Sequence, residues 1–349
     1  MTAPLAAAAK ARTSRATGRV TLDDVAQAAG VSPITVSRAL RGARSVAPEL
    51  VERVRAAAHA LGYVPNLAAR SLASSRGHSV AVLVPLLTNR LFVDLLEAAQ
   101  ATFLAAGYQT LLGVTHYRPE EEERLLQIYA AQRPAGLLLT GFDHTDATRS
   151  LIDDSRLPCV HMMELAVPGD ADIACVGFSQ RDAGQAITRH LLARGRRRIA
   201  FAAAQLDPRV MQRRDGYRQA LAAQGLHDPA LELLDPAPST MAMGARMLER
   251  LLAIEPAVDA VFFCNDDLAQ GALLAAQRHG VAVPGRIAIA GFNDLDGSDQ
   301  MVPPLTSVRT PRAEVGQRAA AMLLDLIAGQ HPVPPQVDLG FEIVARDST

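Results

Sequence analysis

The spacing of apolar residues divides the chain into two regions with different predicted architectures. Between residues 20 and 64, apolar positions recur every three or four residues, which predicts short amphipathic helices. From residue 79 onward, continuous apolar runs such as Val80–Val84 alternate with longer amphipathic stretches such as 92–106. Such runs are typical of parallel strands that are buried on both faces. The second region is therefore predicted to be a doubly wound α/β fold, long enough for two lobes.

Three helices are predicted in the first region. Thr21 is the expected N-cap of a helix over residues 20–29, and Ser32 is the expected N-cap of a second helix that runs to Leu40. A third helix is expected over residues 48–61. Two short helices joined by a tight turn, with a third packed across them, form a helix-turn-helix. A three-helix bundle with another role remains the alternative on this pattern alone.

The second helix carries the side chains expected to read DNA. Pro33, Ile34 and Ser37 would face bases or backbone, and Arg38 can form two hydrogen bonds to guanine. Neither Pro33 nor Ile34 offers a side-chain hydrogen bond, so we expect Ile34 to contact a thymine methyl group.

A short basic helix is expected between the two regions. Asn66 can cap it, and it would end near residue 74. Leu72 is its notable apolar residue and could act as a wedge between base steps in the minor groove. The alternative is that Leu72 packs at a domain boundary.

Charge is distributed unevenly along the chain. Residues 1–77 hold eleven basic and four acidic residues, a balance of +7, whereas the remainder has a balance of −8. A small basic segment joined to a large acidic one suggests a nucleic-acid reader, although an Arg-rich terminus could serve solubility alone. Residues 1–19 lack the compact apolar segment of a secretory signal, so we expect a disordered arm and a cytoplasmic protein.

The cysteines and the hydropathy pattern further narrow the class of protein. Cys159, Cys175 and Cys264 lie beside apolar neighbours, and none belongs to a CxxC pair. We expect them to be reduced core residues, with no bound metal or cofactor. No run of about 18 apolar residues is present, so no membrane span is expected.

Polar side chains gather after the predicted strands of the large region. Ligands of such folds bind beyond the carboxyl ends of the strands, so five clusters at these ends predict a cleft. Helix capping is an equally good interpretation for Asp266 and Asp267. Arg209 and Arg213 could pair with a carboxylate, or could lie on a solvated helix face. The predicted effector-binding residues are Asn89, Phe92, Thr140, His144, Arg209, Arg213, Asn265, Asp267 and Asn293.

Five headpiece segments and three later ones resemble the LacI family in order and spacing. The headpiece segments are Thr21–Ala26, Ala29–Ser32, Thr35–Arg38, Leu61–Asn66 and Ala69–Leu72. The later segments, similar to that family's regulatory domain, are Asn265–Gly271, Ala290–Asp294 and Pro303–Val308. The resemblance implies a periplasmic-binding-protein-like fold for this domain.

The resemblance also implies a function. It implies a homodimeric repressor that binds a pseudo-palindromic operator in double-stranded DNA, with Leu72 inserted at its centre and positions 33, 34 and 38 setting base preference. Arg213, Asn265 and Asn293 match ligand-contacting positions, although position 293 is often aspartate in sugar-binding members. The DNA-binding residues are then Thr21, Ser32, Pro33, Ile34, Thr35, Ser37, Arg38, Asn66, Arg70 and Leu72.

A finer similarity is to the gluconate-operon repressors within the family. It rests on Leu86–Asn89 with Phe92, Gly107–Thr110, Val176–Phe178, Leu206 and Asp207 with Arg209, and Leu339–Phe341. The expected effector is therefore gluconate or a related sugar acid. A neutral sugar, a corepressor, a solute-binding protein and an enzyme remain as alternatives, although no nucleophile elbow, phosphate loop or metal spacing is present.

The predicted organisation has four parts. They are a disordered arm (1–19), a helix-turn-helix headpiece (20–65), a hinge helix and linker (66–77), and a two-lobed effector-binding and dimerisation domain (78–349).

Overall fold

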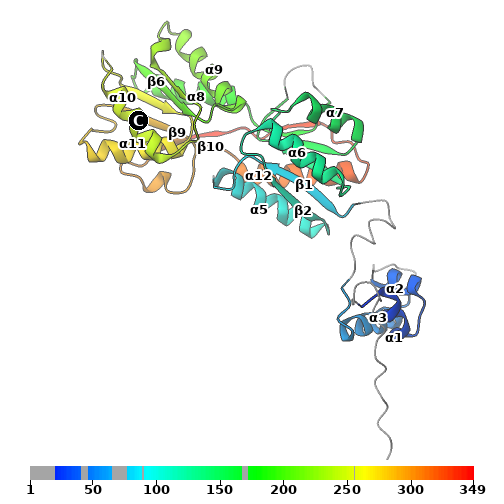
Figure 1. The fold of residues 1–349 in the computed structure, drawn as a ribbon. Coiled ribbons are helices and arrows are strands. Elements are labelled where there is room, and N and C mark those ends of the chain that lie inside the picture. The colour runs from blue at the N-terminus through cyan, green and yellow to red at the C-terminus, as the bar shows by residue number, and fades with distance from the viewer. Residues whose placement is uncertain (1–19, 41–45, 65–76, 89, 167–171, 255) are drawn as a thin grey trace, which may run out of the picture. The chain divides into compact units, whose positions relative to one another are not determined.

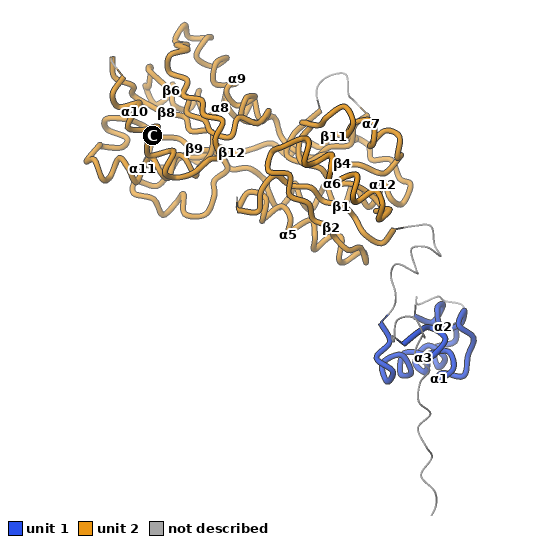
Figure 2. The backbone as a smooth tube through the Cα atoms, in the orientation of Figure 1, with its two compact units in different colours: residues 1–76 blue, residues 77–349 orange. Residues whose placement is uncertain are grey.

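The chain forms two compact units, residues 1–76 and 77–349 (Figure 2). The computed structural model describes residues 20–40, 46–64, 77–88, 90–166, 172–254 and 256–349. No helix among these residues is long and apolar enough to cross a membrane.

The first unit contains the three expected helices, α1 (Leu22–Ala29), α2 (Pro33–Leu40) and α3 (Pro48–Ala60). The Thr21 side chain accepts a hydrogen bond from the Asp24 amide, and the Asp24 carboxylate accepts one from the Thr21 amide. This reciprocal cap satisfies two amides that the first helical turn would otherwise leave unpaired. One residue from each helix, Val25, Val36 and Val54, is fully buried in the core of the bundle.

The second unit consists of two lobes, each with its own six-stranded sheet. The strands of the N-lobe are β1 (Ser79–Val84), β2 (Gln109–Val114), β3 (Gly136–Thr140), β4 (Cys159–Met162), β5 (Cys175–Gly177) and β11 (Gln336–Asp338). Its helices are α5 (Arg90–Ala105), α6 (Pro119–Ala130), α7 (Asp146–Ser155) and α12 (Arg312–Ile327).

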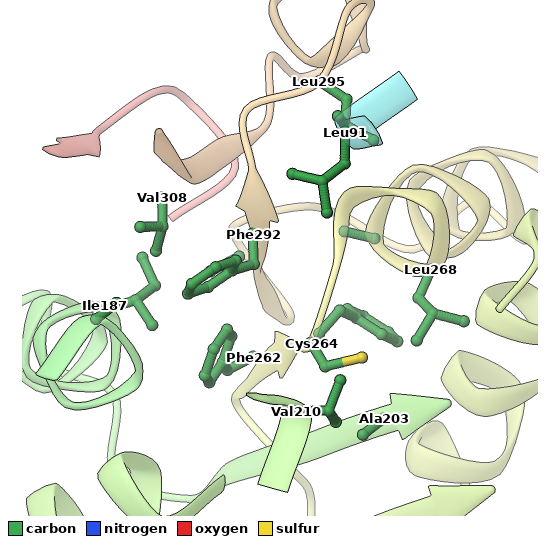
Figure 3. Close-up of a cluster of buried hydrophobic side chains, with 14 of the residues drawn as sticks. Leu91, Ile187, Ala203, Val210, Phe262, Cys264, Leu268, Phe292, Leu295 and Val308 are labelled. Atoms are coloured by element: carbon green, nitrogen blue, oxygen red, sulfur yellow. The ribbon is translucent and has the colours of Figure 1, made fainter. Parts of the chain in front are cut away.

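The C-lobe repeats this arrangement. Its strands are β6 (Ile199–Ala204), β7 (Glu232–Asp235), β8 (Ala260–Phe263), β9 (Ala288–Asn293), β10 (Thr306–Arg309) and β12 (Glu342–Val344). Its helices are α8 (Gln180–Ala193), α9 (Pro208–Ala222), α10 (Met241–Leu252) and α11 (Asp266–Arg278), with short 3-10 turns at Pro229–Leu231 and Ser298–Gln300. In Figure 3, Phe262 and Phe292 lie in its buried apolar cluster with Ile187 and Val308.

Both sheets have a doubly wound strand order. The orders are β11-β5-β4-β3-β1-β2 and β12-β10-β9-β8-β6-β7, and all pairs are parallel except β10 with β12. Strand order reverses beside β1 in one sheet and beside β6 in the other, which places a ligand-binding crevice beyond the carboxyl ends of these strands. The predicted α/β architecture is therefore confirmed.

The N-lobe is built from separate parts of the chain. In the described part of the chain, the segments 177–180, 309–312 and 338–342 connect the lobes, so α12 and β11 return to the N-lobe after the C-lobe is complete (Figure 1). Helix α12 packs beside α5, and a Cβ added at Gly316 would lie 2.1 Å from the carbonyl oxygen of Leu95.

Candidate effector and DNA-binding sites

A cavity of about 300 Å³ is lined by residues of both lobes. The N-lobe contributes side chains that follow β1 and β2, and the C-lobe contributes side chains that follow β6, β7, β8 and β9. The lining residues are Leu86, Thr88, Leu91, Tyr117, Ala204, Gln205, Asp207, Arg209, Val210, Arg213, Ser239, Thr240, Met241, Asn265, Asp267 and Asn293. The cavity therefore occupies the crevice that the strand order specifies.

Five of the nine residues predicted to bind an effector line this cavity: Arg209, Arg213, Asn265, Asp267 and Asn293. Among the described residues, Phe92, Thr140 and His144 do not appear in its wall. These three have different surroundings, described below, and Asn89 lies outside the described residues.

Thr140, Phe92 and His144 have other surroundings. The Thr140 hydroxyl donates to the carbonyl oxygen of Leu83 at 3.0 Å and lines a smaller neighbouring cavity. Phe92 is fully buried, with its ring centre 5.9 Å from the Arg209 guanidinium carbon. His144 is buried between Glu122, 2.5 Å from its Nδ1, and His161, 3.1 Å from its Nε2.

Arg213 is a buried cation held by neutral groups. Its Nε donates to Gln180 Oε1 at 2.8 Å, and its Nη1 donates to the carbonyl oxygen of Cys264 at 2.7 Å. Its guanidinium lies 3.9 Å from the centre of the Phe292 ring. Burial lowers the pKa of Arg213, yet an arginine stays charged in proteins. Asp207 opposes this effect from a distance, but no described carboxylate forms an ion pair with Arg213 within 4.0 Å, so an anion in the cavity would be its first direct ionic partner.

Arg209 differs because it already has an acidic partner. Asp207 caps α9 and lies 3.3 Å from Arg209 Nε. Burial opposes the charge of Arg209, but Asp207, Tyr117 and Glu164 together raise its pKa above the usual value. Its Nη1 is buried without a hydrogen-bond partner among the described residues. This group can therefore still donate to a ligand or a water molecule.

The two asparagines of the cavity wall have different bonding. Asn265 caps α11 through Oδ1, which accepts from the Leu268 amide at 3.1 Å, and its Nδ2 donates to Ser239 Oγ at 2.8 Å. Asn293 ends β9 with a φ of 107°, and its Oδ1 is buried without a described partner. An unpaired buried acceptor is unfavourable, so Asn293 Oδ1 suits a hydroxyl donor from a ligand.

The first unit presents an exposed surface on α2. Ile34 is 65% exposed, and Pro33 and Arg38 are also exposed, whereas Val36 and Ala39 are fully buried. Ser32 Oγ accepts from the Thr35 amide at 3.2 Å, as expected for a cap. The side chains predicted to read bases therefore lie on the outer face of the helix.

Comparison with known proteins gives a family match for the first unit and for the C-terminal part of the second unit. Residues 21–66 match the model of bacterial regulatory proteins of the lacI family, and residues 188–349 match a periplasmic binding protein-like domain. The HTH-type transcriptional regulator GntR of Pseudomonas aeruginosa is 56% identical over 97% of this chain and 98% of its own length. The chain belongs to the LacI family.

Two solved structures of this LacI family agree with the fold. Transcription regulator GntR from Chromobacterium violaceum is 52% identical, with a TM-score of 0.75, over 77% of this chain and 98% of that one. The lac repressor dimer bound to operator and the anti-inducer ONPF is 25% identical, with a TM-score of 0.84, over 95% of this chain and 99% of that one. The protein is therefore a DNA-binding transcriptional regulator, and the predicted family and fold class are confirmed.

Several cavity residues of this LacI-family regulator were not predicted from the sequence. They are Leu91, Tyr117, Ala204, Val210, Ser239, Thr240, Met241 and Gln205. Gln205 directly follows β6, so the strand-end rule could have found it. Tyr117 and the segment 239–241 come from loops after β2 and β7, the outermost strands of the two sheets, and no motif marks those loops.

Asp266 has a structural role in this LacI-family fold. Its carboxylate is fully buried and accepts from the Leu295 amide at 2.6 Å, Ser307 Oγ at 2.7 Å and Ser298 Oγ at 3.2 Å. Its neighbour Asp267 lines the cavity, where burial raises the pKa of its carboxyl. One of two adjacent acids therefore supports the loop after β9, and the other faces the cleft.

Three residues predicted to contact DNA, Asn66, Arg70 and Leu72, lie outside the described residues. Their proposed roles at the hinge depend on the resemblance stated above. The cysteines Cys159, Cys175 and Cys264 are free thiols, and Cys175 and Cys264 are buried.

Proposed function

We propose that this protein is a repressor that binds a pseudo-palindromic operator as a homodimer and releases it when a sugar acid occupies the cavity. Gluconate is the proposed effector, and control of sugar-acid catabolism is the proposed role. The protein acts in the cytoplasm in this proposal, because its target is chromosomal DNA, and its contribution is binding rather than catalysis.

The single observation that carries the effector proposal is the environment of Arg213. It is a buried guanidinium in the cavity wall whose described partners are neutral. A carboxylate can accept two parallel hydrogen bonds from a guanidinium, and such charge-assisted bonds are about twice as strong as neutral ones. A neutral sugar would leave this charge without a directly bonded counter-ion, with only the more distant Asp207 to offset it.

The rest of the cavity suits the polyol chain of a sugar acid. Asn293 Oδ1 and Arg209 Nη1 are a buried acceptor and a buried donor without described partners. Ser239 and Thr240 add hydroxyl groups to the wall. A cavity of about 300 Å³ is at the small end for ligand sites, which favours a small effector. The relative from Pseudomonas aeruginosa is an HTH-type transcriptional regulator, which supports the regulatory role.

In this proposal, some headpiece residues contact the DNA backbone and others contact the bases. Ser32, Thr35 and Ser37 would hold phosphates, whereas Ile34 and Arg38 on the outer face of α2 would contact base edges. Thr21, at the N-terminus of α1, would contact a phosphate, and Pro33 would join Ile34 in apolar contact with the bases. Asn66, Arg70 and Leu72 would act at the centre of the operator.

Calorimetric titration of the full-length protein tests the effector. Gluconate, 2-ketogluconate, 6-phosphogluconate, ribose and hypoxanthine would each be titrated, followed by operator binding with and without the ligand that binds. We expect saturable binding of gluconate and a loss of operator affinity of about 5- to 150-fold. Arg213→Ala should weaken gluconate binding by about 10- to 150-fold, because one hydrogen-bonded charge pair is lost.

The neighbouring arginine provides a matched control. Arg214 pairs with Asp215 at 3.3 Å and is absent from the cavity wall, so Arg214→Ala should bind gluconate like the wild type. Binding of ribose or hypoxanthine with no response to sugar acids would contradict the proposed effector. Tighter operator binding with gluconate would make it a corepressor.

A further inference from the structure

The last residue of β9 and the loop that follows it connect the cavity wall with the N-lobe. We call residues 293–296 the β9 loop. Its first residue, Asn293, lines the cavity, as does Leu91 in the first turn of α5. Figure 3 draws Leu91 and Leu295 in one cluster of buried side chains. The β9 loop therefore packs against the helix that begins the N-lobe side of the cavity.

One side chain bonds to both the β9 loop and α5. Arg312 is the first residue of α12, and its side chain is only 15% exposed. Its Nε donates to Asp94 Oδ2 on α5 at 2.9 Å. Its Nη1 donates to the carbonyl oxygen of Asn293 and, at 3.4 Å, to that of Asp294. A single planar guanidinium thus joins a C-lobe loop to an N-lobe helix.

The backbone that Arg312 holds has an unusual conformation. Asn293 and Asp294 have φ angles of 107° and 51°, in the region that side chains other than glycine rarely adopt. Such residues persist where the surroundings fix them. The Asp294 carboxylate is bound by Arg309 at 2.9 Å and Arg346 at 2.7 Å, both from the C-lobe. Arg312 supplies the corresponding link to the N-lobe.

A second connection between the same segments is much weaker. Arg90 of α5 pairs with Asp296 at 2.6 Å, but the two side chains are 61% and 69% exposed. Exposed ion pairs contribute little, because water and salt screen them. The buried Arg312 contact is therefore the stronger of these two links.

We propose that Arg312 is a positioning residue that fixes Asn293 in the cavity wall and, through Asp94, couples its position to that of α5. This inference depends on the proposed function, because it assigns the route by which effector binding in the cleft changes the N-lobe. When the β9 loop is displaced, its hydrogen bonds to Arg312 move that side chain. The bond from Arg312 to Asp94 then moves α5. Asp94 does not line the cavity, so it takes part in coupling without touching the effector.

The test separates coupling from binding in the full-length protein. For Asp94→Ala, we expect the dissociation constant for gluconate, measured by calorimetry, to stay within about threefold of the wild type. The factor by which saturating gluconate weakens operator binding should fall at least fivefold, since a coupling free energy is lost. Arg312→Gln should raise the dissociation constant for gluconate and lower the factor by which gluconate weakens operator binding, because Asn293 loses its backbone support.

Two control variants belong to the same helices. Glu314→Gln changes an exposed charge two residues from Arg312, and Arg90→Ala removes the exposed pair. Both should keep the wild-type effector response within about twofold. If Asp94→Ala retained the full response, or if Glu314→Gln lost as much of it as Asp94→Ala did, the proposed route would be wrong.

Hydrogen exchange provides a readout that needs no effector. We expect Asp94→Ala to raise amide exchange of the β9 loop at least threefold, although the substitution lies in the other lobe. A purely local role for Asp94 would confine the change to α5, and that result would overturn the coupling. If the wild type did not bind gluconate at all, the effector assignment would fail, and the exchange experiment would still decide the role of Arg312.

Discussion

Asp266 shows what burial does to a single carboxyl group. Three hydrogen bonds favour its charged form, yet it is fully buried, and burial raises its pKa to about 7. A Cβ at Gly291 would lie 2.2 Å from Asp266 Oδ1, so the carboxylate also fills the space beside that glycine. In the unfolded chain its pKa returns to the ordinary aspartate value of 3.8.

The sign of the pH dependence follows from this shift. A pKa that is higher in the folded state means that the folded protein binds the proton more tightly. The stability that Asp266 contributes is therefore fully present below about pH 4 and is lost as the pH rises through about 7. Burial therefore favours the uncharged carboxyl group of Asp266 over the carboxylate more strongly than water does.

Asp266→Asn should remove this dependence. Between pH 5 and pH 8, the free energy of unfolding of the variant should improve relative to the wild type by about 1–3 kcal/mol, measured by urea denaturation. Asp325→Asn, at an exposed position on α12, is the control and should show no such trend. Parallel pH profiles for the wild type and Asp266→Asn would show that Asp266 ionises normally.

At the scale of residues, the sequence predicted which residues lie near the cavity better than it predicted where their side chains point. Arg213, Asn265 and Asn293 were predicted from motif and position, and all three line the cavity. Thr140 ends β3 and His144 follows it, but both bond to other groups of the N-lobe. A residue at the end of a strand is expected at the carboxyl edge of the sheet. The direction of its side chain depends on the geometry of the loop, which the sequence pattern does not contain.

At the scale of elements, two glycines set the distance between α8 and α9. A Cβ at Gly184 would lie 2.3 Å from the carbonyl oxygen of Arg213, and one at Gly216 would lie 2.0 Å from that of Arg181. The helix backbones therefore approach more closely than any side chain would allow. Since Arg213 belongs to α9, this contact also fixes the position of the cation in the cavity.

Gly184→Ala should disturb both stability and binding. The added methyl group meets backbone atoms that cannot rotate away, so we expect a loss of about 1–3 kcal/mol in the free energy of unfolding. Gluconate affinity should fall as well, because α9 and Arg213 move together. Denaturation and calorimetry would measure the two effects, with Gly285→Ala, where the only close contact is 3.4 Å away, as the control. Wild-type behaviour of Gly184→Ala would show that the helices can separate freely.

The prediction of elements succeeded where the apolar pattern was long. The apolar run Val80–Val84 lies within the strand Ser79–Val84, and the helix Pro33–Leu40 matches the bounds expected for the second helix. The strands β5, β7, β10 and β11 were not predicted, since segments of three or four residues hold too little pattern. The glycine contacts were not predicted either, because a glycine within a helix does not reveal its partner.

At the scale of the whole molecule, we expect the first unit to bind the operator and the second unit to bind the effector. The solved GntR structure from Chromobacterium violaceum matches 77% of this chain and 98% of its own, a share close to that of the second unit, residues 77–349, and this unit has its own core. A protein lacking residues 1–77 should therefore fold and bind gluconate like the full chain, while losing operator binding. Calorimetry and an operator shift assay would measure this, and retained operator binding would contradict the assignment of the headpiece.

The discontinuity of the N-lobe has a consequence for how the chain is made. While residues up to about 310 leave the ribosome, the face of the N-lobe sheet beside α5 lacks its second helix, since α12 comes later. The C-lobe lacks only β12 at that stage. Domains usually fold in the order of their synthesis. Here the lobe that begins first is completed only after most of the second, so its apolar surface must stay protected during translation.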